Sequence, residues 1–279
     1  MAYQAGAKDP SSQRFHYISA DLTLAAESAR VIAEAKAWNN GFPPDIVWCC
    51  AGSCHPTLFV DTPVEKLKEQ MDQNYFSAAY MAHATLRSWL KTSPASATEI
   101  SLVESKPKEP RHLIFTSSVM AFYTFGGYSP YSPTKCAIRS LSDSLSNEVN
   151  LYASSIPAPI RLHTIFPGTI FTASYEAENK LKPDFTKKLE EDDGGQTPDQ
   201  VAESSIKGLE RGDELVATSF IARALMCTVL GGSRRNGMGI VDTILSWIVS
   251  IVIVFVRKDM DGKVKEWGRI HGTSGSKTI

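Results

Sequence analysis

Short β-type runs alternate with longer helical runs along most of the chain, and this order constrains the fold more than any other feature. The β-type runs are apolar or β-branched and end in small or turn residues. They are residues 14–19, 45–50, 111–118 and 160–167. The runs between them carry apolar residues at helical spacing. These are residues 23–38, 63–90 and 134–153. Helices that join parallel strands cross over with one hand, so the pattern predicts an α/β fold with a doubly wound parallel sheet.

Length and charge restrict the function classes. The 279 residues, 43% of them hydrophobic, fit one α/β domain or two small ones. The formal net charge of -1 gives no electrostatic reason to expect a nucleic-acid partner. The five cysteines are an odd number, which indicates reduced thiols in a cytosol-facing protein. Cys50, Cys54 and His55 cluster, but no second pair follows at zinc spacing, so we predict no metal and interpret the cluster as a buried strand end.

Composition also marks the segments of the chain. Residues 93–110 are polar and rich in proline and serine, which predicts a surface insertion before a strand. Residues 173–197 are charged and contain glycines, as expected of a mobile flap over the substrate, and Pro198 then starts a helix. We assign residues 1–218 to the main domain and residues 219–279 to a C-terminal segment with a polar tail.

An apolar run within this C-terminal segment covers residues 238–256. It has about the length of a bilayer-spanning helix, and Asp242 is its one charged residue. Three interpretations stay open, namely a spanning helix, a helix inserted from one side or used in a membrane-facing oligomer, and an internal core helix. Basic residues flank both ends, so they do not fix an orientation. These residues are Arg234, Arg235, Arg257 and Lys258.

A tyrosine and a lysine four positions apart carry the clearest chemical signal. On a helix, Tyr131 and Lys135 lie on one face, and a neighbouring ammonium lowers the pKa of a phenol. Ser118 closes the preceding strand, and Asn74 lies on the long helix before it. In a parallel sheet, ligands bind beyond the carboxyl ends of the strands, where Ser118 lies. A solvated Tyr–Lys pair with no function is the alternative.

This order of motifs resembles the short-chain dehydrogenase/reductase family. The family places a serine about 13 residues before a Y-x-x-x-K motif, which matches Ser118, with Ser117 as the substitute. The sequence ISADLT resembles the family's strand end with an adenine-contacting aspartate, and FPGTIFT resembles its P-G-x-[VI]-x-T segment. The sequence CCAG, residues 49–52, stands where the family usually has N-N-A-G, and the two cysteines remove side-chain amides near the cofactor.

The resemblance implies a role for each matching residue. Tyr131 would donate the proton, Ser118 would hold the ketone oxygen, and Asn74 would position a water that passes protons to Lys135. Lys135 would also hold the nicotinamide ribose. The implied cofactor-binding residues are Asp21, Leu22, Ala51, Gly52, Asn74, Tyr131, Lys135, Pro167, Gly168, Ile170 and Thr172. Plainer roles stay open for three of them, because Asn74 can satisfy its own helix, while Asp21 and Thr172 can each cap the helix that follows.

A narrower resemblance concerns the 3-ketodihydrosphingosine reductases, chiefly the fungal ones. The pattern E-x-E-N-x-x-K-P at residues 176–183 and the late apolar run are similar to these enzymes. This implies NADPH-dependent reduction of 3-ketosphinganine, a long-chain keto-lipid, to sphinganine. It also implies an endoplasmic reticulum membrane location with the catalytic domain facing the cytosol. A homodimer or tetramer would form through the helix after Tyr131 and the helix that holds Asn74.

One departure from the family limits these implications. The glycine-rich G-x-x-x-G-x-G turn, which brings backbone amides close to a pyrophosphate, has no match before Asp21. We therefore expect an N-terminally incomplete sequence in which a central strand is missing and sheet edges are exposed. Two alternatives remain, namely another lipid, steroid or retinoid dehydrogenase, and a truncated, catalytically incompetent product that acts only by binding.

Overall fold

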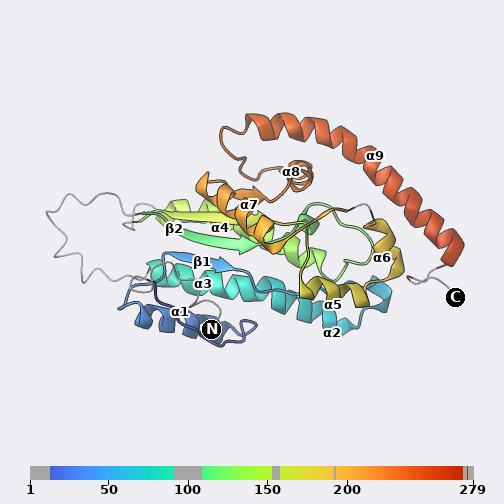
Figure 1. Cartoon of the computed structure of the whole chain (residues 1–279). Helices are drawn as coiled ribbons and strands as arrows, with labels where there is room; N and C mark the ends of the chain where they lie inside the picture. The colour runs from blue at the N-terminus through green and yellow to red at the C-terminus, as the bar shows by residue number, and fades with distance from the viewer. Residues whose placement is uncertain (1–12, 91–108, 153–157, 192, 273–274, 276–279) are drawn as a thin grey trace.

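The central sheet is parallel, as the alternating pattern predicts, and the described residues contain four of its strands, of which the last in the chain was not predicted (Figure 1). The computed structural model describes residues 13–90, 109–152, 158–191, 193–272 and 275. The strands are β1 (Ile46–Cys49), β2 (Arg111–Thr116), β3 (Ile160–Phe166) and β6 (Leu215–Ala217), in the order β1-β2-β3-β6. Val47 pairs with Leu113 and Leu113 with Leu162, so the apolar positions of neighbouring strands lie in register. The predicted surface insertion at residues 93–110 lies almost wholly outside the described residues.

Helices connect the strands and follow the predicted runs closely. They are α1 (Ala25–Trp38), α2 (Val64–Met71), α3 (Ser77–Leu90), α4 (Ser132–Tyr152), α5 (Ala173–Leu181), α6 (Asp184–Leu189), α7 (Pro198–Glu210), α8 (Phe220–Cys227) and α9 (Ile240–His271). A single π-helical turn, η3 (Asp72–Phe76), joins α2 to α3. Pro198 is the first residue of α7, where its missing N–H costs nothing, and Thr197 and Gln200 form a capping box there.

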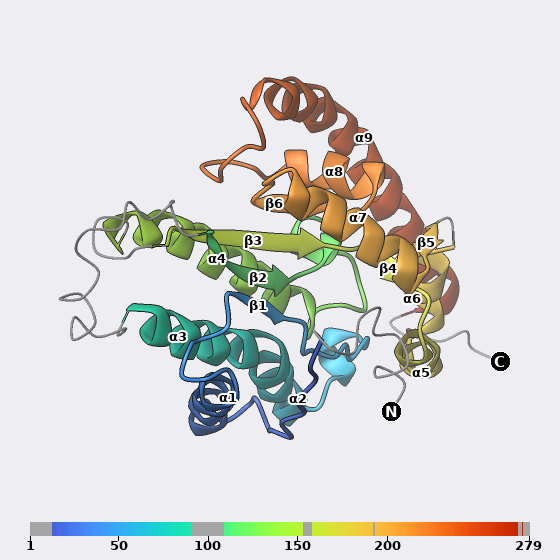
Figure 2. The same cartoon turned by 60° about the vertical axis from the view of Figure 1, so that its left-hand side comes forward.

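Helices cover both faces of the sheet, which confirms the predicted fold class (Figure 2). On one face, Leu113 and Phe115 of β2 pack with Trp89 of α3 and Ile138 of α4, and α1 packs against α3. On the other face, α7 and α8 cover β3 and β6. Ile165 and Val216 pack there against Leu209 of α7. These side chains are largely removed from water. This burial of apolar surface makes the main contribution to holding the layers together.

The prediction of a strand at residues 14–19 is wrong. Residues 13–20 have no regular secondary structure, although they are apolar in part. None of the described strands pairs with this segment, so its backbone joins no ladder of hydrogen bonds. In the described part of the chain β1 therefore ends the sheet, and Ile46 and Trp48 are 62% and 38% exposed there.

A buried histidine of β3, His163, and a partly buried one of β2, His112, link the two strands. His163 Nδ1 lies 2.7 Å from the carbonyl oxygen of Asp213, and its Nε2 lies 2.9 Å from His112 Nδ1. Only one tautomer satisfies both bonds in the neutral pair, with His163 Nδ1 donating to Asp213 and His163 Nε2 accepting from His112. Burial lowers the pKa of both imidazoles below their ordinary value.

We expect this pair to make the fold sensitive to mild acid. The folded state binds protons on these imidazoles more weakly than the unfolded chain does. The free energy of unfolding therefore has its full value above pH ~6.5 and decreases as the pH falls through that value. The melting temperature should fall by several degrees between pH 7 and 5.5. His163→Gln should weaken this dependence, while His83→Gln, an exposed position on α3, should keep it. Equal pH profiles for the two variants would contradict the assignment.

Candidate active site

The structure brings three of the four residues predicted for catalysis, Ser118, Tyr131 and Lys135, to one end of the sheet. Ser118 follows β2 and is 7% exposed, with an extended backbone at the start of a short 3₁₀ turn, η5 (Val119–Ala121). Its Oγ accepts a hydrogen bond from the N–H of Met120 at 3.2 Å. Tyr131 directly precedes α4, and the Ser118 hydroxyl interacts with its phenol. The hydroxyl of Ser117 instead donates to the carbonyl of Lys135 at 2.9 Å, which favours Ser118 as the residue that faces a ligand.

The phenol of Tyr131 differs from the expectation in one respect. Burial raises its pKa above the ordinary value, the charge of Cys54 adds to this, and only the bond to Ser118 lowers it. The ammonium of Lys135 does not lower it here, because Nζ lies 5.5 Å from the centroid of the tyrosine ring and donates to the carbonyl of Thr116 at 3.1 Å. In this state the phenol is fully protonated at neutral pH, as a proton donor must be.

Lys135 is a buried cation at the floor of the site. It is 5% exposed, and burial lowers its pKa to about 8. A Cβ added at Gly52 would lie 3.5 Å from Lys135 Nζ and 2.5 Å from Asn74 Oδ1. The loop that follows β1 therefore passes so close to both side chains that only glycine fits at position 52. This arrangement places Gly52, Asn74 and Lys135 together, as the sequence analysis expects.

Asn74 is fully buried within the π-helical turn η3. Its Nδ2 donates to the carbonyls of Ser53 and Gln70, both at 2.9 Å, and its Oδ1 accepts from the N–H of Ser53 at 3.1 Å. The side chain thus holds the loop after β1 in place, which is the plainer of its two predicted roles. Its use in passing protons through a water stays a prediction. Single π-turns are common at functional sites, which agrees with its position.

The residues predicted to bind the cofactor lie in two groups. Leu22 and Ala51 line a cavity of about 230 Å³ together with Trp48, Cys49, Cys50, Ser77, Ala78 and Met81. Next to it, Asp21 accepts hydrogen bonds from the backbone and hydroxyl of Thr23 and closes the turn before α1. The second group follows β3. Here the Pro167 carbonyl accepts from Val119, Gly168 has open space where a Cβ would be, and Ile170 lies in the short strand β4 (Thr169–Ile170), which pairs with β5 (Gly195–Gln196).

Thr172 has the helix-capping role that was left open for it. Its Oγ1 accepts from the N–H of Tyr175 at 3.1 Å and so caps α5. The cap fixes where the predicted flap leaves the sheet. Asp21, by contrast, is not the cap of α1, because the helix starts at Ala25 and its cap position is Leu24. Binding of a cofactor by either residue stays a prediction.

The flap contains an ion pair that the sequence analysis did not predict. Lys182 is 3% exposed, and its Nζ lies 2.5 Å from a carboxylate oxygen of Glu190. Tyr128 also donates its hydroxyl to Glu190. Beneath α6, a Cβ at Gly127 would lie 1.9 Å from Thr186 Oγ1, and Gly127 has a φ of +99°. The flap is therefore packed onto the loop that leads into Tyr131, and the adjacent glycines at positions 126 and 127 were the sequence signal for this close contact.

A larger cavity, about 660 Å³, lies away from Tyr131. It is lined by α7, β6, α8 and the start of α9, and its polar residues include Arg211, Asp213, Arg223 and Asn236. Most of these charges are already paired, as Arg211 is with Asp213 at 2.7 Å and Arg223 with Asp242 at 2.6 Å. The residues with perturbed pKa values around Ser118 and Tyr131 identify the chemical site better than cavity size does. Among the described residues, no cluster of three or more His, Cys, Asp or Glu side chains could hold a metal.

The geometry of serine, tyrosine and lysine at the end of a parallel sheet is that of a reductase of the short-chain type, and sequence comparison agrees. The family profile described as short chain dehydrogenase matches residues 2–182. The chain belongs to this family.

Particular relatives narrow the comparison. The 3-ketodihydrosphingosine reductase ksrA of Aspergillus fumigatus is 48% identical over 286 residues, which cover 99% of this chain and 76% of that protein. The 3-ketodihydrosphingosine reductase gsl-3 of Neurospora crassa is 43% identical, covering 96% of this chain and 71% of that protein.

Solved structures show the same fold at low sequence identity. A short-chain dehydrogenase from Streptomyces avermitilis has a TM-score of 0.59 and 21% identity, covering 83% of this chain and 79% of that one. A short-chain dehydrogenase from Sphingobium yanoikuyae in complex with NADPH has a TM-score of 0.57 and 17% identity, covering 76% and 71%. Both support the fold alone.

Proposed function

We propose that this chain reduces the C3 ketone of 3-ketosphinganine to the hydroxyl of sphinganine, with NADPH as the reductant. The observation that carries the proposal is the joint presence of Ser118, Tyr131 and Lys135 at one sheet end in a chain that is 48% identical to a 3-ketodihydrosphingosine reductase. The predicted long-chain keto-lipid substrate agrees with the printed names of both reductase relatives.

The residues present fit the nicotinamide half of such a cofactor. Gly52, Lys135 and Asn74 form a close-packed floor, and Gly168 leaves open space at the opposite side. The hydrogen-bonding groups suited to a ribose and a carboxamide are Lys135 Nζ and the backbone between Pro167 and Ile170. The described residues include no glycine-rich turn for a pyrophosphate. NADPH, rather than NADH, is carried over from the resemblance to the 3-ketodihydrosphingosine reductases.

The side chains of the site explain how the reaction would be catalysed. The nicotinamide would supply the hydride to C3, and negative charge would then develop on the ketone oxygen. Ser118 Oγ and the Tyr131 hydroxyl would hold that oxygen, and Tyr131 would transfer its proton to it. If Lys135 turned from the Thr116 carbonyl toward the phenol during the reaction, its positive charge would stabilise the resulting phenolate, and the tyrosine could give up a proton although burial raises its pKa.

Location and assembly extend the proposal. The helix α9 is long and apolar enough to cross a membrane, judged by length and composition. We place the enzyme on the endoplasmic reticulum membrane with its catalytic residues on the cytosolic side, where NADPH and a sphingolipid precursor can meet. We also propose a homodimer or tetramer that forms through α3 and α4.

A substrate panel tests the assignment. The full-length protein should convert 3-ketosphinganine with NADPH to sphinganine, detected by mass spectrometry. It should reduce steroid and retinoid ketones at least 100-fold less efficiently. Conversion of a steroid or retinoid ketone alone would transfer the assignment to the alternative class, and binding without any turnover would support the non-catalytic interpretation.

A further inference from the structure

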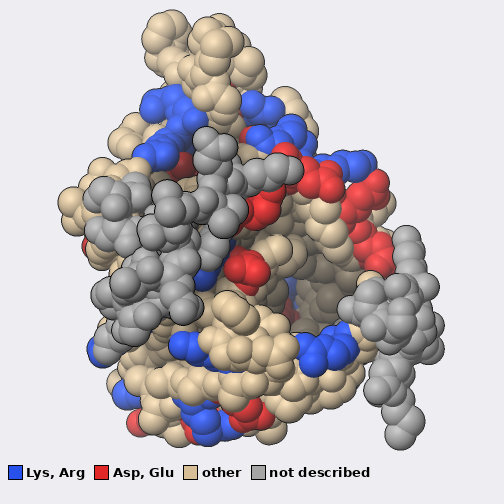
Figure 3. All heavy atoms as spheres, turned by 90° about the vertical axis from the view of Figure 1, so that its left-hand side faces the viewer, with Lys and Arg blue, Asp and Glu red and all other residues tan. Residues whose placement is uncertain are grey.

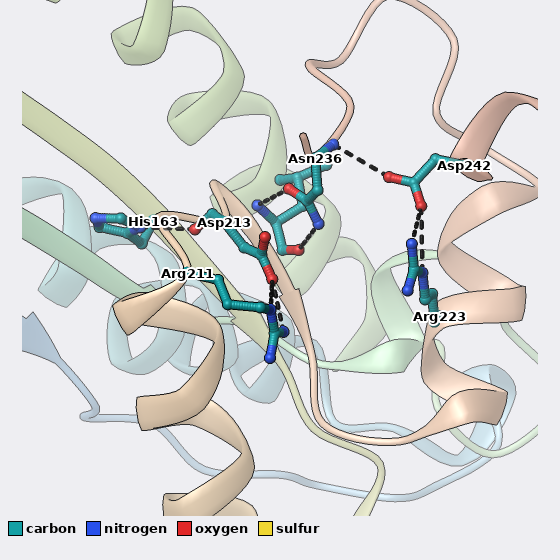
Figure 4. Close-up of polar contacts among 7 residues, drawn as sticks. His163, Arg211, Asp213, Arg223, Asn236 and Asp242 are labelled. Atoms are coloured by element: carbon teal, nitrogen blue, oxygen red, sulfur yellow. Dashed lines mark hydrogen bonds and ion pairs between the residues drawn. The ribbon is translucent and has the colours of Figure 1, made fainter. Parts of the chain in front are cut away.

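The long helix α9 is attached to the catalytic domain near both of its ends. Near the first end, Asp242 is 1% exposed and pairs with Arg223 of α8 at 2.6 Å, while its second oxygen accepts from the N–H of Asn236 (Figure 4). The Asn236 side chain bonds both backbone groups of Leu215 and so binds the outer edge of β6. Near the other end, the ring of Trp267 lies 5.8 Å from the ring of Phe185 in α6.

This double attachment decides between the membrane arrangements left open by the sequence. Asp242 and Trp267 are about 37 Å apart along a helix that rises 1.5 Å per residue, and a bilayer core is ~30 Å thick. If residues 240–256 crossed a bilayer, Trp267 would emerge on the side opposite to Arg223. It could not then contact Phe185, so a spanning helix is incompatible with the contacts at its two ends.

The outer side of α9 carries the side chains that a lipid surface would take up. Large apolar residues there are half exposed or more, and each has another member of the set three or four positions away along the helix. They are Val241, Ile244, Trp247, Ile248, Ile251, Val254 and Phe255. The inner side is different, since Asp242 is buried and Leu245 packs against the core beside α8. Exposed Arg257 and Lys258 follow the apolar stretch, as expected of a helix that lies in a bilayer interface with anionic headgroups.

We propose that α9 lies flat in the surface of a phospholipid bilayer, with this outer apolar side inserted and both ends on the side of the catalytic domain. Figure 1 shows that α9 runs past α8 and ends beside α6, and Figure 3 shows uncharged atoms projecting at the top of the molecule with Lys and Arg grouped below them. The flap helix α6 would thus lie next to the membrane from which a long-chain substrate is drawn.

Protease protection in sealed endoplasmic reticulum vesicles tests the arrangement without any activity measurement. A tag after Ile279 and the catalytic domain should both be cut by protease added outside. Protection of one while the other is cut would overturn the proposal and establish a spanning helix.

Vesicle flotation tests the inserted side. Ile251→Asp should reduce binding of the full-length protein to phosphatidylcholine/phosphatidylserine vesicles at least tenfold. Ser250→Asp, which adds the same charge one position away on the more polar flank, should reduce it much less. Equal vesicle binding by wild type and Ile251→Asp would contradict the proposal. If Ile251→Asp instead dissociated dimers of the protein and still bound vesicles, the apolar side would be a protein interface, and this too would contradict the proposal. Protease protection and vesicle flotation do not depend on catalysis, so both can be interpreted even if the protein lacks the proposed reductase activity.

A second inference concerns the inner face of the flap helix α5 and rests on the proposed function. Tyr175 and Glu178 lie three residues apart on this helix and so share a face, and Lys182 directly follows the helix as its C-cap residue. Lys182 Nζ lies 5.1 Å from the ring of Tyr175 and 5.7 Å from the ring of Tyr128. The Tyr128 ring in turn lies 6.3 Å from the ring of Tyr131, so this face is turned toward the catalytic tyrosine.

Glu178 is the carboxylate of this face that lacks a close partner in the described part of the chain. It is half-buried, and it makes no side-chain hydrogen bond and no ion pair within 4 Å there, because Lys182 is committed to Glu190. Its charge reaches both Cys54 and Tyr131, where it helps to raise the pKa of each. Burial also raises the pKa of Glu178 itself, and the charge of Lys182, which lowers it, offsets only part of that effect.

We infer that Glu178 binds the ammonium group on C2 of the substrate, next to the ketone held by Ser118 and Tyr131. The preference for the amine is measured as kcat/KM for 3-ketosphinganine divided by kcat/KM for the analogue that lacks the C2 amine. Glu178→Gln should lower this ratio at least tenfold. Glu176→Gln, on an exposed position of the same helix, should leave this ratio unchanged. An unchanged ratio in Glu178→Gln would refute the inference, whereas a wild type that reduces neither ketone would refute the proposed function instead.

Discussion

Replacing Tyr131 by phenylalanine should lower kcat for ketone reduction by a factor of about 10² to 10⁴, the range expected when a general acid is removed. The ring stays in place and only the proton donor is lost. The fold should tolerate the change, because the hydroxyl has Ser118 as its hydrogen-bonding partner and the loss of one such bond costs about 1 kcal/mol.

The matched control for this variant is Tyr123→Phe. Tyr123 lies in the segment between η5 and α4, and its buried hydroxyl has no hydrogen-bond partner among the described residues. Removing it should leave kcat within about threefold of wild type and should not lower the melting temperature. A Tyr131→Phe protein that is as active as Tyr123→Phe would show that the proton comes from another group.

Replacing Lys135 by methionine should separate activity from stability. We expect kcat/KM to fall at least 100-fold, because no positive charge would remain to stabilise the phenolate of Tyr131. Stability should stay equal or rise. Burial lowers the pKa of Lys135 from 10.5 to about 8, which corresponds to an unfavourable contribution of order 3 kcal/mol for the charged form at pH 7. The bond from Nζ to Thr116 offsets part of this cost.

The pH dependence of unfolding checks the same reasoning. Between pH ~8 and ~10.5 the unfolded chain holds the Lys135 proton more tightly than the folded one, so this group makes wild type gain stability as the pH rises. Lys135→Met should lose that gain, and Lys180→Met, an exposed position on α5, should retain it. A Lys135→Met protein that melts well below wild type would instead indicate that the lysine is a structural element.

The sequence predicted those parts of the molecule that depend on local pattern. Strands β1, β2 and β3 and the position of Tyr131 at the start of α4 follow from periodicity and from spacing along one stretch of chain. The segment 14–19 has the residues of a strand but no neighbour to pair with. A strand forms only with a partner, and local propensity cannot supply one.

Features that depend on distant contacts could not be predicted in this way. The bond between Tyr128 and Glu190 joins residues 62 positions apart, and it arises only when the flap packs onto the loop before α4. The pKa of Tyr131 was expected to fall because Lys135 is near in sequence. It rises because the phenol is buried, while the Lys135 ammonium points to the carbonyl of Thr116 and does not lower it.

The extent of α9 is a further case. Its apolar part ends at Val256, yet the helix continues to His271. Ion pairs four residues apart support the charged half, with Arg257 and Asp261 at 3.0 Å and Lys263 and Asp259 at 3.3 Å. Hydrophobicity alone identified the apolar half, and the attachment through Trp267 appears only in three dimensions.

The most direct test of the central claim follows the hydrogen atoms. The full-length protein is incubated with 3-ketosphinganine and NADPH that carries deuterium at both positions on C4 of the nicotinamide, and the product is examined by mass spectrometry. If hydride is delivered to the ketone held by Ser118 and Tyr131, sphinganine will form with one deuterium on C3, and Tyr131→Phe will form far less of it. Failure of wild type to form sphinganine, or sphinganine without the label on C3, would contradict the account.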